Sequence, residues 1–363
     1  MSSDFLVDRA EWRRCRVIDA APEPAPGPGQ VLLRVDRFAL TANNVTYAVI
    51  GDMLGYWRFF PADDGWGRIP VMGFGDVLAS RHADVRAGER VFGFFPMATH
   101  LLVDAGDADA AKFADLAPHR ADTAPVYRQY LRTTTDALYD PAREDQLLLL
   151  RGLFMTSFLV DDFLGDNGGF GARTFVVSSA SSKTAIALAA QLRRHRRGRV
   201  IGLTSARNAD FVRGLPYYDG VVEYDAIATL PADEPIVFVD HSGDRAVVDT
   251  LHRHVGDNLR HSAVVGATHW QGRRPSRDLP GAPPTFFFAP AQIEKRTREW
   301  GPAGLEERLG DAWRAFVASS DAWLEVVRGY GPAAVERAYR EVLEGQARPE
   351  QGHVLSMWDE GTR

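Results

Sequence analysis

The segment from Arg173 to Leu192 constrains the fold more than any other part of the chain. It begins with the apolar run Thr174–Val177, passes through several small hydroxyl residues, and continues to Leu192 with apolar residues at helical spacing. A second apolar run, residues 199–204, follows after a short basic stretch. Strand, turn, helix and strand in this order predict a βαβ unit. Its turn directs backbone N–H groups and a helix N-terminus at one point, which suits a phosphate group.

Length and charge limit the classes of protein that can contain this unit. The chain has 363 residues, which is enough for two domains with separate cores. Its net charge of −6 argues against a role at nucleic acid or at a membrane surface. The basic run Arg193–Arg197 stands at the predicted helix C-terminus, where cations complement the helix dipole. We therefore interpret this run as a helix end.

The single cysteine, Cys15, excludes a disulfide within the chain and a thiolate-rich zinc site. The N-terminus lacks the pattern of a signal peptide, and no apolar run is long enough to span a membrane. These observations predict a cytoplasmic protein without bound metal.

The remaining patterns divide the chain into two parts. The first hundred residues predict strands at 30–38, 70–79, 88–95 and 99–103. Residues 104–117 predict a surface excursion or short helix, and residues 123–164 predict mostly helix. After residue 173, strands alternate with helices, which indicates a parallel sheet covered on both faces. The chain ends with predicted helices at 302–319 and 332–344 and a strand at 352–358.

Four segments carry a resemblance to a known family. They are Pro28–Val35, Leu40–Tyr47 with Gly51, Gly73–Gly93 and Leu343–Leu355. In order and wording they resemble the medium-chain dehydrogenase/reductase superfamily, in particular its zinc-free quinone-reductase-like branch. The serine-lysine-threonine turn, the stretch at Thr268–Trp270 and the stretch at Phe286–Pro290 are also similar to a divergent, uncharacterised domain-of-unknown-function subgroup of that superfamily.

The resemblance implies an α/β fold with a GroES-like partial β-barrel domain and a Rossmann domain with a doubly wound parallel sheet. It assigns residues 1–149, completed by 299–363, to the first domain and residues 150–298 to the second. The active cleft would follow their junction.

The phosphate-binding turn departs from the family pattern, which has glycines in a G-x-x-G-G-x-G arrangement. Here Ser178, Ser181, Ser182 and Thr184 occupy those positions. Serine is small and brings a hydroxyl group, and Lys183 adds a positive charge. The turn therefore either replaces backbone contacts with side-chain contacts, or it has lost the ligand.

The end of the second strand indicates which cofactor the chain binds. Enzymes specific for NAD place a carboxylate there, but the first acidic residue is Asp210. Arg207 instead offers a guanidinium for a 2′-phosphate, which favours NADP. The predicted cofactor contacts are Ser181, Ser182, Lys183, Thr184, Thr204, Ser205, Arg207, Asn208, Asp240, Ser242, Gly266 and Thr268.

The predicted catalytic residues are Tyr47, Asn44 and His269. The resemblance implies that Tyr47 and Asn44 lie in a loop after a strand and face the cleft. His269 follows a strand of the parallel sheet. His241 is a further candidate proton donor, and Tyr56 and Trp57 shape either a substrate pocket or the core.

The predicted function is a zinc-independent, NADP(H)-dependent oxidoreductase that transfers hydride to an activated C=C or C=O of a small enone-like or quinone-like molecule. A non-catalytic or regulatory nucleotide-binding protein, and a lyase or isomerase that retains the NADP pocket, stay open as alternatives. A P-loop is disfavoured because Val177 and Ser182 replace its glycines, and no G-x-S-x-G motif indicates a serine hydrolase. The predicted partner is a small-molecule substrate, with no nucleic acid and no membrane, and a homodimer stays open.

Overall fold

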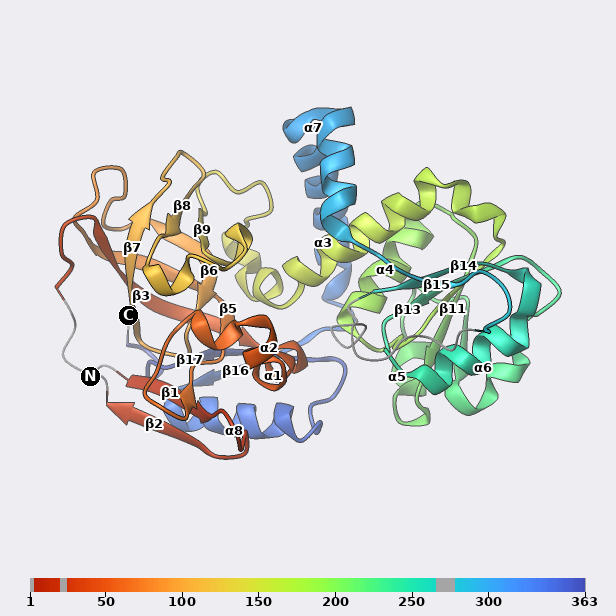
Figure 1. The fold of residues 1–363 in the computed structure, drawn as a ribbon, viewed down its shortest axis with the longest axis horizontal. Coiled ribbons are helices and arrows are strands. Elements are labelled where there is room, and N and C mark those ends of the chain that lie inside the picture. The colour runs from red at the N-terminus through yellow and green to blue at the C-terminus, as the bar shows by residue number, and fades with distance from the viewer. Residues whose placement is uncertain (1–2, 20–24, 266–277, 363) are drawn as a thin grey trace. The chain divides into compact units, whose positions relative to one another are not determined.

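The computed structural model describes residues 3–19, 25–265 and 278–362 (Figure 1). The chain divides into two compact units. The first consists of Met1–Leu149 and Leu324–Arg363, and the second of Leu150–Trp323.

The first unit is built around a closed β-barrel. β3 (Gln30–Leu40) pairs antiparallel with β5 on one edge and with β7 on the other, which closes the ring. The ring contains β3, β5 (Val71–Ser80), β6 (Arg90–Phe95), β9 (Gln129–Arg132), β8 (Lys112–Asp115) and β7 (His100–Gly106). The predicted barrel is therefore present. Two of its strands lie where the sequence predicted other structure. β8 replaces part of the surface excursion or short helix expected at 104–117, and β9 replaces helix within 123–164, where the prediction is confirmed only from residue 144 onward.

Further elements surround the barrel. β17 (Gln351–Ser356) and β16 (Glu325–Tyr330) extend the barrel sheet from β3. A small sheet contains β2 (Cys15–Asp19), β1 (Ser3–Asp8) and β4 (Trp66–Gly67). The helices of this unit are α1 (Ala42–Val49), α2 (Gly51–Leu54) and α8 (Pro332–Leu343). Tyr339 of α8 is fully buried, and its ring meets Phe5 of β1 edge-on at 5.3 Å between centroids.

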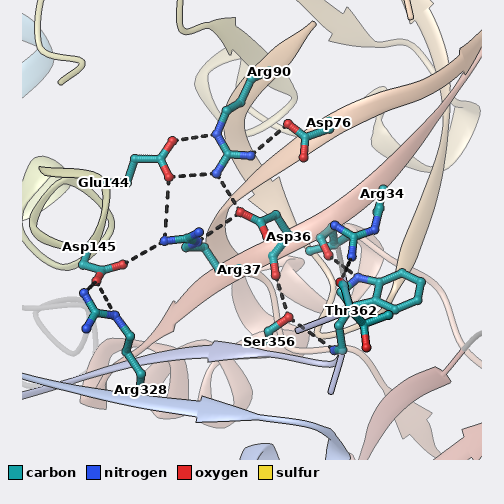
Figure 2. A network of polar contacts seen from close by, with 12 residues as sticks. Arg34, Asp36, Arg37, Asp76, Arg90, Glu144, Asp145, Arg328, Ser356 and Thr362 are labelled. Carbon is teal, nitrogen blue, oxygen red and sulfur yellow. Dashed lines mark hydrogen bonds and ion pairs between the residues drawn. The ribbon is translucent and has the colours of Figure 1, made fainter. Parts of the chain in front are cut away.

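A network of charged side chains fixes the first turn of α3 (Glu144–Asp166) to the barrel (Figure 2). The Arg90 guanidinium donates to both carboxylate oxygens of Glu144, at 2.6 and 2.8 Å. It also donates to Asp36 at 2.7 Å and to Asp76 at 2.8 Å. Asp145, the next residue of the helix, accepts from Arg328 of β16 at 2.8 Å. Charged groups from four strands, β3, β5, β6 and β16, therefore form the network that holds one end of α3.

The second unit contains a six-stranded parallel sheet in the order β12-β11-β10-β13-β14-β15. Its strands are β10 (Thr174–Val177), β11 (Arg199–Thr204), β12 (Gly220–Glu223), β13 (Ile236–Asp240), β14 (Leu259–Val264) and β15 (Pro284–Phe286). From β10 the chain builds outward through β11 and β12, then returns to add β13 on the other side. Because such crossovers are right-handed, α4 (Lys183–Arg194) and α6 (Arg245–Val255) cover opposite faces, which is the doubly wound arrangement.

The remaining helices of this unit are α5 (Ala209–Arg213) and α7 (Ala289–Ser320). α7 changes direction at Gly301, whose φ is +73°, just before Pro302. Beyond this point its side chains pack on α3, and the ring of Phe154 stacks on Phe316 at 5.1 Å. Residues 299–323, which the sequence analysis assigned to the first domain, therefore belong to the second unit.

Candidate functional site

The segment that opened the sequence analysis forms a tight turn between β10 and α4. The turn contains one residue with left-handed backbone, Ser179, whose φ is +47°. Its N–H donates to the Tyr224 hydroxyl at 2.9 Å. Ser182 is the N-cap of α4, and its hydroxyl accepts from the Ala185 N–H at 3.2 Å. The first N–H groups of α4 have no acceptor inside the helix, so this end of α4 suits an anionic group.

Ser178 connects the turn to the neighbouring strand. It is fully buried, and its hydroxyl donates to the Asp240 carboxylate at 2.6 Å. The Ser178 hydroxyl oxygen also accepts from the N–H groups of His241 at 2.8 Å and Ser242 at 3.1 Å. Asp240 also accepts from the hydroxyl of Ser242 at 2.6 Å. A serine in the first glycine position thus bonds the carboxyl ends of β10 and β13 together.

These contacts change the interpretation of two predicted cofactor ligands. Asp240 is buried, and its carboxylate is occupied by Ser178, Ser242 and the Gly243 N–H. The Ser242 hydroxyl donates to Asp240 and accepts from the Asp244 N–H at 3.1 Å. Both side chains therefore shape the loop after β13, and their role as direct cofactor contacts stays a prediction. Their partners are distant in sequence, so no local pattern could reveal this structural role.

A second contact connects the turn to the end of β11. The Asn208 amide donates to the Ser181 hydroxyl at 2.9 Å, across 27 residues of sequence. Both were predicted cofactor contacts, and the structure brings them together. Thr204 is buried at the end of β11, whereas Arg207 is exposed in the 3₁₀ turn Ala206–Asn208. The exposed tip of β11 thus presents a guanidinium beside polar groups, and the next acidic residue in the sequence, Asp210, pairs with Arg213 at 2.8 Å.

The close packing that the family obtains from a glycine in the turn is obtained here from a glycine in β11. A Cβ at Gly202 would lie 2.8 Å from the Ala180 Cβ and 3.1 Å from the Tyr218 ring. The Ala180 N–H donates to the Leu203 carbonyl at 2.9 Å. A side chain at position 202 would push the turn away from β11, so Gly202 allows a glycine-free turn to pack tightly.

Three predicted site residues lie outside the described residues. They are Gly266, Thr268 and His269, within residues 266–277.

The first unit contains the two other predicted catalytic residues, and both lie on α1. Tyr47 lies on α1 and not in the predicted loop; its hydroxyl accepts from the Asn43 amide at 3.1 Å. Asn44 is buried, and its amide donates to the Pro70 carbonyl at 2.9 Å while its oxygen accepts from the Thr41 N–H at 2.8 Å. Asn44 therefore caps α1 and fixes it to the barrel. Its catalytic role stays a prediction.

Tyr47 belongs to a group of aromatic side chains that also includes Tyr56, Phe59, Phe94 and Tyr127. Its ring stacks on Tyr56 at 4.4 Å between centroids. Burial raises the pKa of Tyr47 above its usual value of 10.0, and the neighbouring Tyr127 adds to the shift. The Tyr47 phenol consequently keeps its proton at any physiological pH. Trp57 is buried against Gly51 and Gly67, which assigns it to the core.

Other features limit what the chain can bind. Within the described ranges, no group of three or more His, Cys, Asp or Glu side chains could hold a metal ion. None of the described helices combines the length and apolar character of a membrane span. In the basic run, Arg193 pairs with Asp219 at 2.6 Å, and His195 and Arg197 pair with Asp161 at 2.6 and 3.1 Å. These side chains serve the packing of their own unit.

Solved structures with a similar fold cover nearly the whole chain at low sequence identity. CurA from Vibrio vulnificus in complex with NADPH matches with a TM-score of 0.64 and 14% identity over 98% of both chains. The yhdH oxidoreductase from Salmonella enterica in complex with NADP matches with a TM-score of 0.56 and 12% identity, over 98% of this chain and 99% of that chain. These similarities confirm the fold expected from the resemblance, with a GroES-like barrel and a Rossmann domain.

The chain's own sequence matches no curated protein. It does match a family model over residues 38–348, which is most of its length. The predicted relationship to a divergent subgroup is thereby confirmed, and the chain belongs to the family described as Protein of unknown function (DUF2855).

Proposed function

We propose that the chain is a zinc-independent, NADPH-dependent reductase of small molecules with an activated C=C or C=O, such as enones or quinones. The observation that carries the proposal is the polar surface at the ends of β10 and β11, where the N-terminus of α4, the Ser181–Asn208 pair and the exposed Arg207 follow one another. In an open parallel sheet, ligands bind outside the carboxyl ends of the strands where the strand order reverses. Here that place is the pair β10 and β13.

The chemistry of these residues fits a dinucleotide with a 2′-phosphate. The N-terminus of α4, with Ser181, Ser182, Lys183 and Thr184, would hold the pyrophosphate. Ser205 and Arg207 would hold the 2′-phosphate, because a guanidinium favours a dianion there. Bound NADPH would supply the hydride, and this chain's residues would orient it and exclude water. Two neighbours in fold, CurA and the yhdH oxidoreductase, were crystallised with NADPH or NADP.

Binding and turnover assays separate this proposal from its alternatives. NADPH should bind more tightly than NADH, and its oxidation should be seen with at least one member of a panel of enones, quinones and aldehydes. Replacing Arg207 with Ala should weaken NADPH binding by roughly 10- to 150-fold and leave NADH binding nearly unchanged, because one charged hydrogen bond is lost. Arg196, an exposed arginine at the end of α4, provides the matched control, Arg196→Ala.

Equal affinity of the wild type for NADPH and NADH would contradict the preference. Tight NADPH binding without oxidation across the panel would favour a non-catalytic nucleotide-binding protein. Product formation without net oxidation of the cofactor would favour a lyase or isomerase.

Tyr47 is the residue that we propose as proton donor to the reduced substrate. Its hydroxyl accepts from Asn43, so its own proton stays available for donation. Tyr47→Phe should lower kcat by roughly 10²- to 10⁴-fold, and leave the NADPH Kd unchanged. Because the pKa of Tyr47 is raised, its proton stays bound to high pH, and the wild type should show no loss of kcat from this group between pH 7 and 9. Tyr56→Phe, in the stacked neighbour, is the control; equal kcat for Tyr47→Phe and wild type would remove Tyr47 from the mechanism.

A further inference from the structure

His241 occupies the point in the second unit where a ligand is most expected. It is the first residue after β13, and β10 and β13 are the neighbouring strands between which the strand order reverses. Its backbone N–H donates to the Ser178 hydroxyl, so Ser178 holds His241 against the end of β10. The loop after it is further fixed by Asp240, which accepts from the N–H groups of Ser242 at 2.9 Å and Gly243 at 3.2 Å. The position of the His241 backbone is therefore well determined by its surroundings.

One ring nitrogen of His241 is unpaired in this rigid setting. Its Nε2 is buried and has no hydrogen-bond partner among the residues that the structure describes, although the residue as a whole is partly exposed. Buried polar atoms in native proteins are nearly always paired, so an unpaired one needs an explanation. His252, another buried histidine of the same unit, shows the usual arrangement. Its Nδ1 lies 3.1 Å from the Pro280 carbonyl and its Nε2 lies 3.0 Å from the Ser262 hydroxyl.

The protonation state of His241 restricts the kind of group that it can bind. Burial lowers the pKa of His241 to about 4, although the adjacent Asp240 carboxylate opposes the shift. The imidazole is therefore neutral at physiological pH, with one donor nitrogen and one acceptor nitrogen. A neutral ring is matched to hydroxyl and carboxamide groups, whereas a phosphate would favour a cation.

The strand order indicates which half of a dinucleotide would reach this residue. Arg207 and Asn208 follow β11, on one side of β10, and His241 follows β13, on the other side. If the pyrophosphate lies at α4 and the adenosine half extends over β11, the nicotinamide half extends over β13.

We propose that the His241 imidazole binds the nicotinamide nucleotide half of NADPH by a hydrogen bond to its ribose hydroxyls or carboxamide. This assignment rests on the proposed function, because it requires that the chain binds the dinucleotide. In this proposal, a rotation about the side-chain bonds of the partly exposed residue turns Nε2 toward the ligand. His241 is then a residue whose polar atom stays unsatisfied until the cofactor binds.

Two probes test the assignment: NADPH, and 2′,5′-ADP, which contains only the adenosine half with its phosphates. His241→Leu should weaken NADPH binding about 3- to 10-fold, the effect of one neutral hydrogen bond, and leave the Kd of 2′,5′-ADP unchanged. Its Tm without ligand should equal or exceed that of the wild type, because an unpaired buried polar atom is removed. Arg207→Ala should weaken the binding of both NADPH and 2′,5′-ADP. His252→Leu, the matched control, should lower the Tm and leave the ratio of the two affinities unchanged.

His241→Gln, which keeps a hydrogen-bond donor and acceptor, should recover part of the NADPH affinity that His241→Leu loses. Equal NADPH affinity for His241→Leu and wild type would overturn the assignment. So would an equal loss of affinity for NADPH and 2′,5′-ADP in His241→Leu, or an identical loss of NADPH affinity in the Leu and Gln variants. A wild type that binds 2′,5′-ADP and NADPH, combined with any of these results, would leave the proposed function intact. A wild type that binds neither probe would overturn both proposals.

Discussion

Ser178 shows how one side chain can replace a glycine without loss of structure. Its hydroxyl makes three hydrogen bonds that connect β10 to the loop after β13. The next residue, Ser179, has the left-handed backbone for which a glycine would be the usual choice. The turn therefore gains side-chain hydrogen bonds at Ser178 and accepts backbone strain at Ser179.

These two serines predict opposite effects on stability. Ser178→Ala should lower the free energy of unfolding by about 1–3 kcal/mol, because it removes the acceptor of buried N–H groups and a donor to Asp240. Ser179→Gly should leave it unchanged or raise it by up to about 1 kcal/mol, because glycine adopts positive φ without strain. Urea unfolding followed by circular dichroism measures both. A Ser178→Ala variant as stable as the wild type would contradict the role given to this hydroxyl.

Residue identities predicted this site only in part. The small hydroxyl residues, the basic tip and the strand ends were all visible in sequence, and Ser181 and Asn208 do meet. The roles of Asn44 and Asp240 were not visible, because each is decided by partners supplied by tertiary structure, such as the Pro70 carbonyl and the Ser178 hydroxyl. The same limit applies to His241, whose unpaired nitrogen is a property of its surroundings alone.

At the scale of elements, long patterns were predictable and short ones were not. β3, β5 and β6 follow clear alternation or apolar runs between glycines and prolines, and the structure contains them near the predicted bounds. β8 and β9 have only four residues each, and their pairing with one another supports strands that their own sequences barely favour. β16 was missed altogether, because its apolar residues Val326 and Val327 are adjacent and do not alternate.

The first turn of α3, which Arg90 holds, gives a specific prediction for the free energy of unfolding. The Arg90 side chain is 21% exposed, and it separates the carboxylates of Asp36, Asp76 and Glu144. Arg90→Met leaves these negative charges without their common cation, and should lower the free energy of unfolding by about 3 kcal/mol at pH 7. Arg328→Met, on the same network but 57% exposed, is the control and should cost less than about 1 kcal/mol.

The stability lost in Arg90→Met depends on pH, and the direction of this dependence follows from the pKa of Asp36. Burial favours the protonated form of Asp36, but the hydrogen bond and charge of Arg90 outweigh it and lower the pKa of Asp36 below its ordinary value of 3.8. A lowered folded-state pKa stabilises the wild type above about pH 4, and this contribution disappears as the pH falls through the folded-state pKa. The difference in stability between wild type and Arg90→Met should therefore shrink between pH 5 and pH 3. Urea unfolding at several pH values measures it, and a difference independent of pH would contradict the ionic role of Arg90.

For the whole molecule, the proposals predict where along the chain NADPH reduces hydrogen exchange. Segments far apart in sequence but together at the strand ends should be protected: residues 178–186, 204–209 and 240–244. The basic run at residues 193–197 should be unaffected, because it stands at the opposite end of α4 and three of its side chains, Arg193, His195 and Arg197, already pair within the unit. Exchange measured by mass spectrometry with and without NADPH tests the pattern.

The comparison with 2′,5′-ADP assigns each protected segment to one half of the cofactor. This shorter ligand should protect residues 178–186 and 204–209 and leave residues 240–244 as in the free protein, because only the nicotinamide half extends over β13. Protection of residues 193–197 in place of residues 204–209 would place the 2′-phosphate on the basic run and contradict the role of Arg207. Equal protection of residues 240–244 by both ligands would show that the loop after β13 responds to the phosphates and that His241 does not bind the nicotinamide half.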